Sequence, residues 1–351
     1  SEIENLYSRA LEELLKSFNL GFSIAGVKYL DVLFNRNAKS QATEFILNNL
    51  FNSTYSLYKA GSMTLFDTNK TLLDRSTATD FLKLATLLDD ADQFPDAFWK
   101  FGTMLRDGTM VAKDEAGALE HFFKAASYGS SAAAVSLGHA ALSENAKAQK
   151  VLQSSDTPSI HLQNLINTNS KIAYEYFHNA SFAGLKEGIW CEAMCKLHGI
   201  GCAENKVAAI ELLHQLSAQG DPDAYYYLGK MAINISKSSK QSTNFSNSLF
   251  QLGLQFFIMA AQRNHSIALF RLGLFIFRQQ VRSDMICMSL SIDPSLPNNI
   301  IATRLFKQSA DLGNRNAAAL FSLCLENGIG AVQNLEMAKV YASTAGTLST
   351  E

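Results

Sequence analysis

The chain has 351 residues, of which 47% are hydrophobic and 18% are charged. This balance suffices for a buried core and excludes an intrinsically disordered protein. A net charge of −2 gives no electrostatic reason to expect a nucleic-acid partner, and no apolar run is long enough to predict a membrane-spanning helix. The chain begins Ser-Glu-Ile-Glu without a basic, apolar leader, so a signal peptide is either absent or already removed.

Residues 1–93 predict an irregular helical region. Leucines and a phenylalanine at helical spacing indicate an amphipathic helix at the start, and further helices are expected at 43–51 and 78–88. We interpret this region as degenerate repeats or an N-terminal cap. Four aspartates between positions 89 and 96 are more typical of a loop and a helix N-cap than of a cation site.

A regular repeat occupies residues 94–351. Its marker is a helix-ending residue, which is followed four and nine positions later by two small residues. The markers are Gly129, Gly184, Gly220, Asn264 and Gly313. Glycine adopts the left-handed conformation that ends a helix, and asparagine is its usual substitute. The period predicts about six helical hairpins, and hairpins of this kind must stack to bury their apolar faces.

A large apolar residue stands seven positions before each marker. We expect these side chains to fill the space between hairpins, while the small residues let the helix backbones approach closely. The row consists of Phe122, Phe177, Leu213, Phe257 and Phe306.

Several motifs resemble the Sel1-like repeat, a relative of the tetratricopeptide repeat. They are AFWKFG, AYYYLG and ALFRLG, the loops RDGTMVAKD, HGIGCAEN and ENGIGAVQN, and the endings FFKAASYG and FKQSADLG. The resemblance implies an all-α, right-handed superhelical solenoid of stacked antiparallel hairpins. It also implies a noncatalytic adaptor or scaffold that binds a protein or peptide and organises a complex.

Three hairpins are longer than the others. Their additional residues are expected to form loop insertions at 143–169, 234–247 and 279–299. Such loops are interpreted either as neutral lengthening, which costs a surface loop little stability, or as contacts with a partner. The third insertion carries apolar residues that favour a contact with a partner: Met285, Ile286, Met288 and Leu290.

The first helix of each hairpin is expected to line a concave groove. Residues one and three positions after its first small residue should point into this groove, and the row is apolar and aromatic with two flanking cations. The candidates are Phe98, Lys100, Ile189, Tyr225, Tyr227, Leu269 and Arg271. Such a groove would suit a helix or an extended peptide with apolar anchors and some acidity. The alternative is that curvature of the stack buries the row within the chain.

Evidence for an enzyme is slight. Residues 56–59 match the Ser-x-x-Lys pattern of penicillin-recognising enzymes, but their partner motifs are absent, so an uncharacterised hydrolase is a minor alternative. No phosphate-binding loop or metal-ligand spacing predicts a cofactor.

Cysteines and sequons bear on the compartment. Five cysteines are an odd number and favour reduced, buried thiols, whereas five Asn-x-Ser/Thr sequons permit the endoplasmic-reticulum lumen. A lumenal substrate-receptor subunit of a ubiquitin-ligase quality-control complex is therefore an alternative function. The last hairpin shows no polar capping helix, so the solenoid is expected either to be truncated here or to dock its C-terminal end on another chain.

Overall fold

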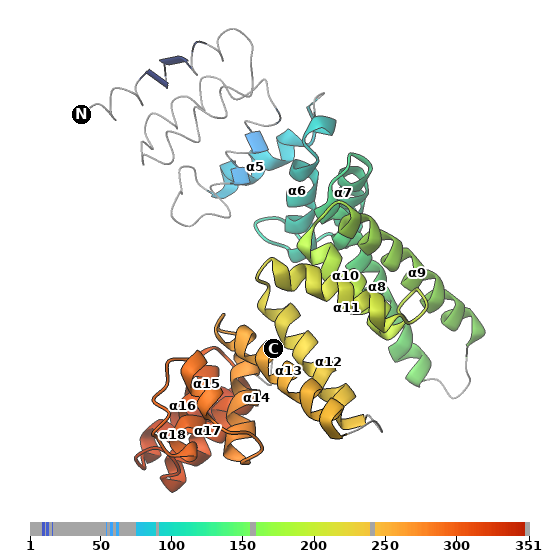
Figure 1. Ribbon diagram of the computed structural model, residues 1–351. Helices are drawn as coiled ribbons and strands as arrows, with labels where there is room; N and C mark the ends of the chain where they lie inside the picture. The colour runs from blue at the N-terminus through green and yellow to red at the C-terminus, as the bar shows by residue number, and fades with distance from the viewer. Residues whose placement is uncertain are drawn as a thin grey trace. The chain divides into compact units, whose positions relative to one another are not determined.

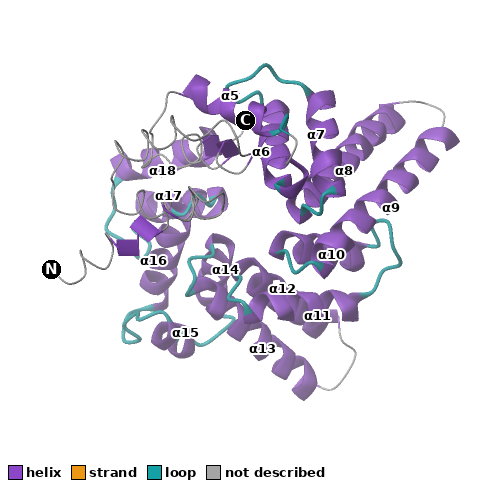
Figure 2. Cartoon of the chain, turned by 90° about the horizontal axis from the view of Figure 1, so that it is seen from above, coloured by secondary structure: helices purple, strands orange, loops and turns teal. Residues whose placement is uncertain are grey.

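The computed structural model describes residues 75–88, 91–154, 159–238 and 243–347, together with isolated positions before residue 63. Over these residues the fold contains helices and loops and no strand (Figures 1 and 2). The all-α prediction is confirmed. Most of the predicted N-terminal region, residues 1–93, lies outside the described residues, as do Ser56 and Lys59.

The chain divides into two compact units. The first comprises residues 1–191 and 200–202, and the second comprises residues 192–199 and 203–351. The helices of the first unit are α5 (Arg75–Ala85), α6 (Pro95–Asp107), α7 (Glu115–Ser127), α8 (Ser131–Ser154) and α9 (Ile160–Phe182), and α10 (Lys186–His198) begins there. The second unit contains α11 (Lys206–Ala218), α12 (Pro222–Ser238), α13 (Thr243–Ala261), α14 (Ser266–Phe277), α15 (Asp284–Ser289), α16 (Asn298–Asp311), α17 (Arg315–Asn327) and α18 (Leu335–Thr347).

The helices pair as stacked hairpins. In the first unit α6 packs against α7 and α8 against α9, and in the second α12 packs against α13, α14 against α16, and α17 against α18. Helices α10 and α11, which form the remaining predicted hairpin, occur where the sequence places them.

The helix-ending markers behave as predicted. All four marker glycines have positive φ, and Asn264 substitutes for glycine at φ 59°. Side-chain oxygens of Ser130, Asp221 and Asn314, each directly after a marker, accept a hydrogen bond from the backbone N–H three residues later and start the next helices. Short polar residues thus set the register of the array.

The phenylalanine row packs within each hairpin as well as between hairpins. The second small residue of a first helix lies against the phenylalanine ring of its own second helix. The pairs are Gly102 with Phe122, Gly138 with Phe177, Gly229 with Phe257, and Gly273 with Phe306. A β-carbon at any of these glycines would overlap the ring, so the close approach of each helix pair depends on the missing side chain.

The prediction of loops at 143–169 and 234–247 is wrong. Both segments are mainly helical and lengthen α8, α9, α12 and α13. Polarity suggested loops, but the Glu, Lys, Gln and Ala residues of the first segment are good helix formers, and neither segment contains glycine. In Figure 1, α8 and α9 run beside each other along this additional length.

A buried asparagine joins the lengthened helices. The Nδ2 of Asn145 donates to the backbone oxygen of Ile166 at 3.1 Å and to Oγ of Ser170 at 2.9 Å. Asn145 lies twelve residues after Ala133, about where the shorter hairpins turn. These bonds tie α8 to α9 at the level where the additional turns begin.

The third insertion is a true excursion between α14 and α16, and α15 lies within it. Ile286 is fully buried, and Met285 and Leu290 are partly buried against the core of the second unit. This apolar segment is therefore buried largely against its own chain. Of the four residues predicted to contact a partner, only Met288 is well exposed, at 72%.

Candidate protein-binding surface

The predicted groove is largely closed. Phe98, Ile189 and Leu269 are buried, with 5% or less of their surface exposed. Phe98 packs against the ring of Tyr128, with centroids 5.6 Å apart, and Leu269 belongs to the core of the second unit. The prediction that these three side chains meet a partner is wrong, because packing within the chain covers them. The equivalent position in α12, Tyr225, stays partly exposed.

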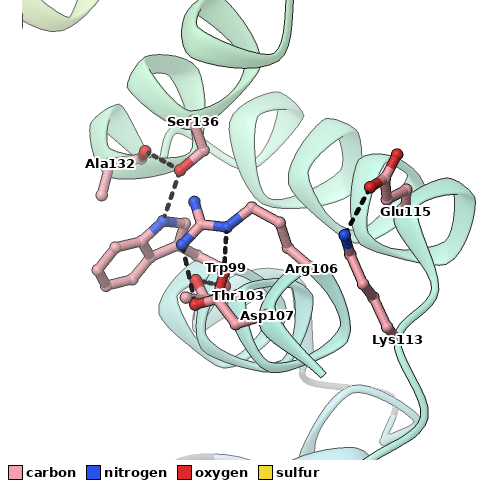
Figure 3. Close-up of polar contacts among 8 residues, drawn as sticks. All are labelled: Trp99, Thr103, Arg106, Asp107, Lys113, Glu115, Ala132 and Ser136. Atoms are coloured by element: carbon pink, nitrogen blue, oxygen red, sulfur yellow. Dashed lines mark hydrogen bonds and ion pairs between the residues drawn. The ribbon is translucent and has the colours of Figure 1, made fainter. Parts of the chain in front are cut away.

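In the first unit, the neighbouring positions link one hairpin to the next. Trp99 donates from Nε1 to Oγ of Ser136 at 3.0 Å, and Ser136 in turn donates to the backbone oxygen of Ala132 (Figure 3). The partly buried Lys100 has its Nζ 4.7 Å from the centroid of the Trp99 ring. Burial lowers the pKa of Lys100, although Asp96 opposes the shift. This part of the row serves mainly to pack α6 against α8.

The remaining candidates, Tyr225, Tyr227 and Arg271, lie in the second unit and are at least partly exposed. The Arg263 guanidinium lies 4.7 Å from the Tyr225 ring centroid, and Lys230 Nζ lies 5.2 Å from that of Tyr227. Cations over the ring faces favour these ring orientations. The exposed surface formed by these residues and their neighbours on α12 and α14 is called the α12–α14 surface below.

A pocket with a volume of about 160 Å³ lies between α12 and α14. Four cations line it, together with two amides and apolar side chains from α12, α13 and α14. The cations are Lys230, Lys237, Arg271 and Arg278; the amides are Asn234 and Gln280; the apolar residues are Tyr226, Ile233, Phe257, Leu274 and Phe275. No carboxylate lines this basic pocket, and within the described part of the chain its four cations form no ion pair.

The sequence explains this charge. No Asp or Glu stands between Asp223 and Asp284, whereas seven Lys and Arg residues do, in a chain whose overall charge is close to zero. Of the basic pocket's cations, sequence reasoning singled out only Arg271. The acid-free interval was the signal that could have located the other three.

A second, larger pocket in the first unit differs in character. It has a volume of about 470 Å³ and is lined by α6, α7, α8 and α9, with Leu119, Phe123 and Ile172 among its apolar residues. The charges at its rim are paired within the chain. Arg106 pairs with Asp107 at 2.8 Å and Glu115 with Lys113 at 2.8 Å (Figure 3), and Lys147 pairs with Glu144 at 2.7 Å. These pairs leave little charge for a partner.

Four of the five cysteines are buried, and Cys202 is partly exposed. The five cysteines, all of them among the described residues, form no disulfide. Burial raises the pKa of Cys191 to about 12, so this thiol stays protonated at neutral pH. The described residues contain no group of three or more His, Cys, Asp or Glu side chains that could hold a metal ion. In the same residues, no helix has both the length and the apolarity needed to cross a membrane.

His265 fixes the start of α14 beside the basic pocket. Its Nδ1 accepts from the backbone N–H of Ala268 at 3.0 Å, its Nε2 lies 2.9 Å from Asp223, and its ring stacks on Tyr226. Because Nδ1 accepts, the ring is neutral and donates from Nε2 to the carboxylate. Burial lowers the pKa of His265, against the opposing effect of Asp223.

We therefore expect acid to destabilise the second unit through His265. The unfolded chain takes up a proton near pH 6.5, whereas the folded chain takes it up at lower pH. The contribution to stability is thus complete above about pH 6.5 and is lost as pH falls through the folded-state pKa. Thermal denaturation between pH 7.5 and pH 5 checks this, and His265→Asn, which retains a capping acceptor, should lose part of the pH dependence. An unchanged acid slope in that variant would assign the effect to other groups.

Comparison with known protein families identifies repeats in four of the six hairpins. The sequence matches the profile of the Sel1 repeat at residues 99–130, 191–221, 266–314 and 317–349. The unmatched hairpins are α8 with α9 and α12 with α13, whose helices carry the additional turns. No curated protein matches the sequence significantly.

Two solved structures are similar to the chain. The structure of a Sel1 repeat protein from Oxalobacter formigenes aligns with a TM-score of 0.55 and 18% identity, over 82% of this chain and 96% of its own. The structure of c5321, a protective antigen of uropathogenic Escherichia coli with an SLR fold, aligns with a TM-score of 0.40 and 17% identity, over 95% and 79%. At 18% identity, the likeness to the Oxalobacter formigenes protein concerns the fold alone.

Proposed function

We propose that this chain, four segments of which match the Sel1 repeat, is a noncatalytic adaptor that binds a protein partner on the α12–α14 surface. The observation that supports this most is the basic pocket. It combines four exposed cations that form no ion pair within the described residues with an apolar floor, and the partly exposed ring of Tyr227 lies beside Lys230. Interfaces are enriched in aromatic residues and arginine. Of the predicted groove residues in the second unit, this surface retains the three that are at least partly exposed, Tyr225, Tyr227 and Arg271.

Site-specific photocrosslinking in the organism of origin tests this function. A photoreactive phenylalanine analogue replaces Tyr227, which is a conservative change at a partly exposed ring. Phe182, which is 91% exposed at the end of α9, provides the control position. We expect discrete covalent adducts with one or a few proteins from position 227 and none of the same adducts from position 182. Identical adducts from both positions, or none from position 227, would contradict an adaptor that uses this surface.

The lumenal substrate receptor remains a second proposal, and the positions of three sequons favour it. Asn179, Asn234 and Asn244 are exposed on helices of the structure. A glycosidase-sensitive gel shift of the native protein would support this proposal, and an unglycosylated native protein would weigh against it. Since Asn234 lines the basic pocket, a glycan at that position would obstruct it. Mapping the modified asparagine therefore separates the two proposals.

A further inference from the structure

The four cations of the basic pocket form two parallel pairs. Lys230 and Lys237 are seven residues apart on α12, and Arg271 on α14 stands seven residues before Arg278, the C-cap of that helix. Two turns of helix place the members of each pair on one face, about 10.5 Å apart along the axis. Each pair therefore borders the pocket at two levels along its helix.

The centre of the pocket is apolar. Ile233 and Phe257 are buried at its floor, and the half-buried Leu274 and Phe275 lie beside them. The ring of Phe275 stacks on that of Phe257 at 6.3 Å, which ties α14 to α13. The volume of about 160 Å³ is close to that of a cavity known to accept benzene, roughly 150 Å³. One large apolar side chain therefore fits between the charged levels.

We propose that the basic pocket binds an extended acidic segment of a partner protein, with one apolar side chain in the cavity and carboxylates on either side paired with the cations. This inference rests on the proposed adaptor function and specifies its ligand. An extended chain advances about 3.3 Å per residue and alternates its side chains, so carboxylates two positions before and two positions after the apolar residue share its face. They lie about 13 Å apart, which long Lys and Arg side chains from levels about 10.5 Å apart can reach. The amides of Asn234 and Gln280 can pair with the segment's backbone.

The pocket suits such a segment better than a nucleic acid. A nucleic acid presents a continuous row of phosphates and calls for a continuous basic face, whereas here an apolar floor separates the two levels of charge. All four cations are exposed, so each ion pair contributes little, and the affinity depends on several pairs acting together with the buried side chain. Binding should therefore be moderate and should weaken as salt is added.

Fluorescence anisotropy with the full chain tests this proposal. The probe is a labelled peptide, Gly-Ser-Asp-Glu-Phe-Asp-Glu-Ser-Gly. We expect it to bind at about 50 mM salt and at least roughly fivefold more weakly at about 300 mM. Replacing its acidic residues by Asn and Gln, or its Phe by Gly, should weaken binding by about tenfold or more, because the first change removes the ion pairs and the second empties the cavity.

Two variants of equal charge change locate the site. The pocket variant Lys237→Gln/Arg271→Gln should bind the peptide about tenfold more weakly. The control variant Lys206→Gln/Lys339→Gln alters exposed lysines on α11 and α18 and should bind like the wild type. Circular dichroism must show both variants to be folded. Equal losses in both variants would show that binding follows total charge and would overturn the pocket assignment.

The remaining outcomes separate the ligand from the function. A phosphopeptide or a single-stranded oligonucleotide that binds roughly tenfold more tightly than the acidic peptide would overturn the assigned ligand. Crosslinks from position 227 without any peptide binding would overturn the acidic segment and leave the adaptor function standing. If position 227 gives no crosslinks and the peptide does not bind, both proposals are contradicted.

Discussion

Replacing Gly330 by alanine should destabilise the second unit by about 3 kcal/mol or more. Gly330 has φ +68°, and a β-carbon there would overlap the backbone oxygen of Asn299 on α16. Thr303 of α16 also holds this turn, because its Oγ1 donates to the oxygen of Ile329 at 3.0 Å. The backbone of the turn must therefore move away from α16 and strain that bond. Urea denaturation followed by circular dichroism measures the loss.

Gly313 provides the matched control. It has φ +84°, but a β-carbon there would meet no atom within 4 Å. Gly313→Ala should therefore lower the free energy of unfolding only by the cost of holding alanine in the left-handed conformation, about 1–2 kcal/mol. Equal losses at both positions would show that the contact between the turn and α16 contributes nothing. The difference between the variants isolates that contact from the conformational preference of glycine.

A second large effect is expected at the pairing of Gly138 with Phe177. A β-carbon at Gly138 would lie 2.5–2.9 Å from three atoms of the Phe177 ring, and no other group is among its three nearest neighbours. Gly138→Ala should destabilise the first unit by about 2–3 kcal/mol through overpacking. Phe177→Leu removes ring atoms from a fully buried position and should cost about 1–2 kcal/mol by itself.

The double variant tests whether the two positions are coupled. Leucine at 177 removes much of the ring that the new methyl group would meet. Gly138→Ala/Phe177→Leu should therefore be more stable than the sum of the single changes predicts, by about 1 kcal/mol or more. Additive losses would mean that the methyl group is accommodated elsewhere. Denaturation of the wild type and the three variants under one set of conditions completes the cycle.

The repeat could be predicted from the sequence because its register depends on local chemistry. The marker glycines, the substitute Asn264 and the small residues that follow each constrain backbone geometry at a fixed spacing. Helix length was harder to predict. The polar residues of 143–169 favour helix as readily as they favour a loop, and pairing across the hairpin, including the buried Asn145, decides between them.

The candidate site was predicted less well. Whether Phe98, Ile189 and Leu269 face a partner or the next hairpin depends on how closely the hairpins stack, and residue type does not determine that distance. The basic pocket was missed because its four cations come from two helices separated by a third. Their positions in the two repeats do not correspond, so alignment of the repeats cannot reveal them.

The turn glycines show how hairpins of unequal length share one array. Gly201 lies against the backbone of Ser170, and Gly330 lies against that of Asn299. Both contacted residues stand three positions before the small residue of a second helix, Ala173 or Ala302. In α9 the residues before this contact are additional to the common repeat. Turns added at that end extend a hairpin beyond its neighbour's turn and leave the contact untouched. A hairpin can therefore acquire new exposed surface through insertion while its spacing within the array is conserved.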